Sequence, residues 1–125
     1  MWLKRLGAAF VIALAVPLSM AGSATADAPI PAQCKNIGNG NLCIELDSPY
    51  SPGWYQKIHG GTVCGTLYMI GGGSFQNIGD FCWSAGQTHT GHGYTGSAGG
   101  CWHTRLRVDR PGGGYDEYDS PLACR

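Results

Sequence analysis

The sequence contains no Cys-x-x-Cys pair and no run of basic residues, and only 13% of its residues are charged. Zinc sites and thiol redox sites commonly use such closely spaced cysteine pairs, so neither is expected here. A chain without a basic patch is also a poor partner for nucleic acid or for an anionic membrane. We therefore expect no metal, no cofactor and no nucleic-acid partner.

Long helices are not expected either, because 21 of the 125 residues are glycine. A glycine in a helix interior costs about 1 kcal/mol relative to alanine. The sequence shows no internal repeat and no linker that would separate a second domain. Short strands joined by many turns, forming one domain over residues 27–125, are the prediction.

Residues 1–26 have the pattern of a secretory signal peptide. Lys4 and Arg5 precede an apolar run from Leu6 to Met20, and the segment ends in Ala24-Thr25-Ala26. The run is shorter than the roughly 20 residues needed to span a bilayer. We expect cleavage after Ala26, secretion to the extracellular space without membrane attachment, and a monomeric product.

All six cysteines follow the predicted cleavage point, and an even number in a short exported chain indicates three disulfides. Each consecutive pair straddles a segment rich in glycine or asparagine, which favours Cys34–Cys43, Cys64–Cys82 and Cys101–Cys124. Six cysteines allow fifteen pairings. A competing set joins 43 with 64, 82 with 101 and 34 with 124, because Gly53 and Gly91 also lie near midpoints.

Seven strands are predicted, at 42–47, 54–59, 62–70, 81–83, 88–94, 101–109 and 115–118. The segment 101–109 alternates most clearly, with Trp102, Thr104, Leu106 and Val108 on one face. Residues 27–33 read as a loose leader, and 47–53 as a turn-rich loop. The expected fold is all-β, a small antiparallel sandwich or flattened barrel held by three disulfides.

Catalytic residues are not evident, and we expect no enzyme activity. No Asp or Glu lies within eight residues of His89 or His92, and these two histidines should lie on opposite faces of a strand. The serines lack the context of an activated nucleophile. Asp116, Glu117 and Asp119 cluster in one short segment and are interpreted as a solvated edge.

Aromatic residues give the better functional signal. Most of the large aromatic residues are expected to fill the core: Trp54, Tyr55, Trp83, Tyr94 and Trp102. However, Trp54 and Tyr55 are neighbours, so in a strand they point to opposite faces and one should be exposed. An exposed rigid aromatic side chain is a good binding anchor. Trp54, Tyr55 and the following Gln56 are the predicted binding residues.

The run from Gly86-Gln87-Thr88 to Gly93-Tyr94-Thr95-Gly96-Ser97, shortly after Cys82, resembles the proteinaceous α-amylase inhibitors of the tendamistat type. That family consists of small exported bacterial β-sandwich proteins. Its exposed Trp-Arg-Tyr triplet, which occupies the enzyme's cleft, is similar in placement to Trp54-Tyr55, although no arginine separates these two here. The resemblance implies an inhibitor of an extracellular hydrolase.

Three functions follow as expectations. The leading one is a secreted, non-catalytic binding protein that inhibits an extracellular glycosidase such as α-amylase. The alternatives are a carbohydrate or cell-wall binding module, and a structural protein without a discrete ligand. A flat row of exposed aromatic side chains favours glycan binding, whereas anchors that project from a loop favour inhibition.

Overall fold

The computed structural model describes residues 30–125, and the predicted signal peptide lies outside them. Nine strands follow one another along the described chain: β1 Ile30–Asn36, β2 Gly40–Leu46, β3 Tyr50–Lys57, β4 Val63–Gly71, β5 Ser74–Trp83, β6 Thr88–Tyr94, β7 Cys101–Asp109, β8 Tyr115–Asp119 and β9 Ala123–Cys124. The part of the chain from residue 30 onward contains no helix.

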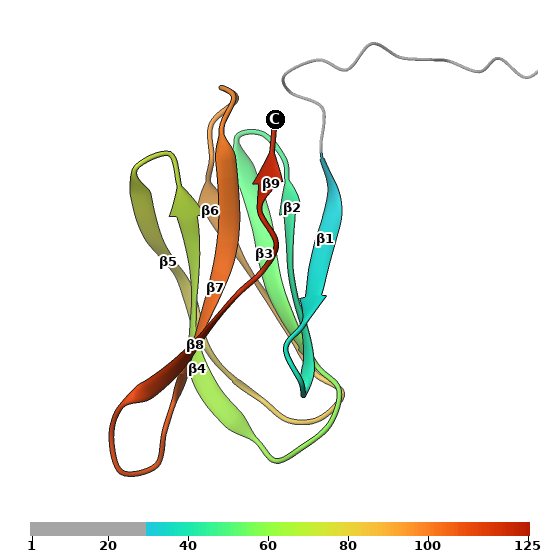
Figure 1. Cartoon of the computed structure of the whole chain (residues 1–125), viewed down its shortest axis with the longest axis vertical. Coiled ribbons are helices and arrows are strands. Elements are labelled where there is room, and N and C mark those ends of the chain that lie inside the picture. The colour runs from blue at the N-terminus through green and yellow to red at the C-terminus, as the bar shows by residue number, and fades with distance from the viewer. Residues whose placement is uncertain (1–29) are drawn as a thin grey trace, which may run out of the picture.

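Two antiparallel sheets pack face to face (Figure 1). The first sheet has the strand order β1-β2-β3-β6, and the second has the order β5-β4-β7-β8, with β9 also paired to β7. The hairpin of β7 and β8 extends beyond the sandwich at the end that also holds the β1–β2 turn (Figure 1). The sheets do not close into a barrel, so the sandwich prediction is confirmed.

The three disulfides join Cys34 to Cys43, Cys64 to Cys82 and Cys101 to Cys124. This is the pairing predicted from the turns that lie between consecutive cysteines. In each case the two cysteines are direct partners in the register of adjacent antiparallel strands. Their Cα atoms lie 4.1, 3.9 and 4.1 Å apart. Each bond therefore links two strands that already pair, and the competing connectivity is wrong.

Some predicted boundaries are wrong. Strand β1 starts at Ile30, so residues 30–33 of the expected leader belong to a strand that pairs with β2. Strand β3 begins at Tyr50 instead of Trp54, and β5 begins at Ser74, directly after the glycine bend. Strand β9 was not predicted because it is only two residues long.

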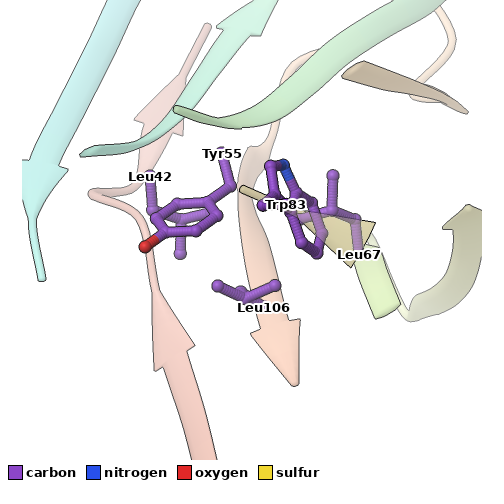
Figure 2. Packing of buried hydrophobic residues seen from close by; sticks show 5 residues of the cluster. All are labelled: Leu42, Tyr55, Leu67, Trp83 and Leu106. Carbon is purple, nitrogen blue, oxygen red and sulfur yellow. The ribbon is translucent and has the colours of Figure 1, made fainter. Parts of the chain in front are cut away.

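The core between the sheets consists of two clusters. One contains Leu42, Tyr55, Leu67, Trp83 and Leu106, and Figure 2 shows these side chains packed together. The Trp83 indole is fully buried and meets the Tyr55 ring edge to face, with centroids 5.3 Å apart. The second cluster contains Ile44, Leu46, Met69, Trp102 and Ala123. Aromatic packing of this geometry stabilises a core beyond its buried area.

Arg125 ties the end of β9 to the β2–β3 loop and to the β6–β7 connection between the sheets. Its guanidinium donates hydrogen bonds to the carbonyl oxygens of Asp47 at 2.9 Å, Ala98 at 3.1 Å and Thr95 at 3.2 Å, and also to that of Gly96. Backbone bonds between Arg125 and Gly100 complete the contact. The planar guanidinium suits this role because it carries five donors in a fixed fork.

Candidate functional site

The structure separates the three predicted binding residues. Trp54 is half-buried on the outer face of the first sheet, where its register partners are Cys43 and Thr90. Gln56 is exposed on the same face. Tyr55 points the other way and is only 3% exposed.

Tyr55 is therefore not part of an exposed binding surface, and that part of the prediction is wrong. Its neighbours in the chain alternate in burial along β3, as expected for a strand with one face on the core. The ring packs against Trp83 because β3 lies in the middle of the first sheet, opposite the second sheet. The two adjacent aromatic residues do point to opposite faces.

The outer sides of β3 and β6 together form a surface that we call the aromatic face. Its members alternate along the two strands and lie opposite one another in the register: Tyr50, Pro52, Trp54 and Gln56 on β3, and Tyr94, His92, Thr90 and Thr88 on β6. The face contains no Asp, Glu, Lys or Arg. Three aromatic rings and several hydrogen-bonding groups thus share one side of the sheet.

Tyr50 and Tyr94 are the most exposed aromatic residues of the face, at 57% and 56%. They are register partners, and their rings meet edge to face with centroids 5.5 Å apart. The side chain of Gln76 on β5 donates to the Tyr94 carbonyl oxygen at 2.7 Å and accepts from the Tyr94 amide at 2.8 Å. A single side chain therefore satisfies both the N–H and the C=O of Tyr94.

A second group of aromatic residues crosses the outer face of the second sheet. Phe75, Tyr68, Arg107 and Tyr115 each come from a different strand. The Tyr68 and Phe75 rings lie 4.7 Å apart, and the Arg107 guanidinium lies over the rings of Tyr68 and Tyr115, at 5.1 and 4.2 Å from their centroids. Because the cation covers both tyrosine rings, this row is less available to a ligand than the aromatic face.

The carboxylates near the end of the chain are held by arginines. Asp119 accepts two hydrogen bonds from Arg105, at 2.7 and 3.2 Å, which lower the pKa of the Asp119 carboxyl. Glu117 lies 3.2 Å from the same guanidinium. Asp116 pairs with Arg110. The expected solvated edge is thus a set of ion pairs between β8 and arginines on β7 or directly after it.

His89 and His92 lie on opposite faces of β6. His89 turns inward, and its ring stacks on Phe81 with centroids 5.0 Å apart. His92 is exposed on the aromatic face. Among residues 30–125, no three His, Cys, Asp or Glu side chains lie close enough together to hold a metal ion.

His103 supplies a prediction about pH. Its side chain is 18% exposed, and burial lowers the pKa of the imidazole; Asp119, 3.6 Å away, raises it, and Arg105 lowers it. Because the folded pKa lies below the unfolded value of about 6.5, protonation opposes folding. This group's contribution to stability is therefore complete above that pH and is lost as the pH falls through the folded pKa. Asp119→Asn should lower the pKa of His103 further.

An NMR titration of the His103 ring protons tests this expectation. Asp116→Asn is the matched control, because Asp116 pairs with Arg110 and does not act on the imidazole. A His103 pKa that rises or stays constant in Asp119→Asn would contradict the assigned role of the carboxylate.

The sequence prediction missed Tyr50, Pro52, His92 and Tyr94 as members of the aromatic face. Pro52 and Gly53 indicated a loop, because proline is rare within a central strand. The pairing of β3 with β2 ends at Gly53, so at Pro52 the strand is paired with β6 alone. The alternation of residues 50, 52, 54 and 56 was the signal that could have revealed this face.

Comparison with known proteins gives no match: no protein-family model, no curated protein and no solved structure is similar to the chain. Within the described residues, no helix has the length and apolar character to cross a bilayer.

Proposed function

We propose that this protein is an extracellular, non-catalytic glycan-binding module whose ligand lies on the aromatic face. The observation that carries the proposal is the arrangement of Tyr50, Trp54 and Tyr94 on the outer side of two adjacent strands. Three disulfides in a chain of this size are typical of proteins outside the cell.

The chemistry of the aromatic face suits a polysaccharide. Pyranose rings present flat C–H surfaces that pack against aromatic rings, and their hydroxyl groups need donors and acceptors beside those rings. Thr88, Thr90, Gln56 and His92 supply such groups around the aromatic residues. The lack of charged side chains on the face favours a neutral glycan.

The geometry of the face suits an extended ligand. Tyr50 and Trp54 lie four residues apart on the same side of β3, which separates their Cα atoms by about 13 Å. That length exceeds a single sugar ring, so a chain of sugars can contact both. The strands and the Cys34–Cys43 bond hold these residues in place before binding, so little conformational entropy is lost.

Inhibition of a hydrolase is supported less well by this arrangement. An inhibitor of the expected kind displays its anchors from a projecting loop, whereas Trp54 lies inside β3 and Tyr55 is in the core. Inhibition of α-amylase or another secreted glycosidase is therefore the alternative result that the experiment below would detect.

Retention of the purified protein on insoluble cellulose, chitin and bacterial cell wall tests the proposal. We expect retention on at least one of them and a loss of about tenfold or more in affinity for Trp54→Ala, because a stacked aromatic anchor carries much of the binding energy. Tyr115→Ala is the matched control: Tyr115 is 46% exposed but lies on the second sheet, so binding should not change.

Two results would contradict the proposal. One is a lack of retention on every glycan together with micromolar inhibition of a glycosidase. The other is equal loss of glycan binding in Trp54→Ala and Tyr115→Ala.

A further inference from the structure

A cavity of about 200 Å³ is lined by residues of both sheets. Its lining includes residues of the β1–β2 turn and of β8, which lie at the same end of the sandwich; Figure 1 shows the β1–β2 turn and the β7–β8 hairpin at that end. Its apolar lining comes from Ile37, Val63, Leu106 and Val108. These residues belong to the Leu42–Trp83 core cluster or pack against it. The cavity is therefore continuous with the core, and it is separate from the aromatic face on the outer side of the first sheet.

Four residues with polar groups line the cavity. Asn39 lies in the β1–β2 turn, Tyr55 lies on β3, and Asp116 and Tyr118 lie on β8. Asp116 is paired with Arg110, so its charge is balanced. The remaining groups are two phenol hydroxyls and one amide.

Tyr55 is the distinctive member of this lining. The side chain is 3% exposed, yet its hydroxyl makes no hydrogen bond with any residue from 30 to 125. A buried tyrosine hydroxyl normally has a partner. In Figure 2 the hydroxyl points away from Trp83, out of the packed cluster. Four side-chain atoms are fully buried without a hydrogen-bond partner, and they belong to Trp83, His103, Thr104 and Arg107. The Tyr55 hydroxyl is not one of them. The hydroxyl therefore has surface open to the cavity, where water or a ligand can pair with it.

We propose that this cavity is a binding site for a small, uncharged molecule with one apolar ring and one hydrogen-bonding group, which pairs with the Tyr55 hydroxyl. The volume supports a single ring, since an engineered apolar cavity of about 150 Å³ binds benzene. The aliphatic walls hold the ring, and Tyr118 and Asn39 offer further hydrogen bonds at the opening.

Titration with 4-methylphenol, followed by backbone amide NMR shifts, tests the proposal. Toluene, which has the same ring without the hydroxyl, is the matched probe. Both should shift the amides of Asn39, Val63 and Leu106. Tyr55→Phe removes only the unpartnered hydroxyl, so the variant should fold normally. It should bind 4-methylphenol about five- to tenfold more weakly and toluene unchanged, as expected for the loss of one hydrogen bond.

Val63→Phe provides a second variant, because a larger side chain at the lining should fill the cavity and weaken the binding of both probes. The proposal would be overturned by a cavity that takes up neither probe, by shifts confined to other parts of the protein, or by equal 4-methylphenol affinity in Tyr55→Phe. These results are independent of glycan binding, which Tyr55→Phe should leave intact.

Discussion

Replacement of Gly91 by alanine should destabilise the protein by about 3 kcal/mol or more, because the new methyl group overlaps the backbone of a neighbouring strand. A Cβ atom at Gly91 would lie 2.2 Å from the carbonyl oxygen of Ile78 and 2.8 Å from its Cγ1 atom. Backbone atoms cannot rotate out of the way as a flexible side chain can. Strand β6 or strand β5 would therefore have to shift.

Urea unfolding of the purified variant measures this effect. Gly61→Ala is the matched control, since a Cβ atom at Gly61 has no heavy atom within 4 Å and the residue has no positive φ. We expect its midpoint to stay close to that of the unmodified protein. If Gly91→Ala lowers the free energy of unfolding by less than about 1 kcal/mol, β5 and β6 must lie farther apart at this edge than the structure shows.

Removal of the Cys101–Cys124 disulfide by the double substitution to alanine should have a similarly large effect. The bond closes a loop with a sequence separation of 23 residues. Constraint of the unfolded chain by a loop of this length contributes about 3.5 kcal/mol in the chain-entropy model. The bond also holds the two-residue strand β9 and the adjacent Arg125, whose guanidinium joins two loops. We therefore expect the double substitution to lower the free energy of unfolding by more than the chain-entropy contribution alone.

The Cys34→Ala/Cys43→Ala variant is the comparison. This bond has a sequence separation of 9 residues, which corresponds to about 2.7 kcal/mol in the same model. Denaturant unfolding of both variants should rank the Cys101–Cys124 removal as the more damaging. The reverse order would mean that Arg125 and β9 hold their place without the covalent link.

Much of the fold could be predicted because its signals are local. The segment from Cys101 to Asp109 alternates between apolar and polar residues, and the observed burial follows that alternation through Leu106. The glycines at 71–73 fixed the hairpin between β4 and β5, and this placed Cys64 opposite Cys82. Disulfide pairing followed from strand pairing, because the cysteines flank the turns.

The aromatic face could be predicted only in part, because it depends on how strands meet across the sheet. Trp54 was recognised from its own strand, but Tyr94 lies 40 residues further along and joins it only through the pairing of β3 with β6. The sequence shows that Trp54 and Tyr55 point to opposite faces of a strand, but not which of the two faces packs against the other sheet. For this reason the sequence placed Tyr55 on a binding surface. The second sheet decides that question, and its position is a long-range property.

The side-chain amide of Gln76 limits the pairing of strand β6 with a strand from a second molecule. Strand β6 is an edge of the first sheet, and edge strands expose backbone groups that a strand from another molecule can pair with. By bonding both the N–H and the C=O of Tyr94, Gln76 occupies a donor and an acceptor that an incoming strand would need. The Gln76 side chain thus interrupts the row of free backbone groups at that end of β6, and this disfavours pairing of β6 with a strand of a second molecule.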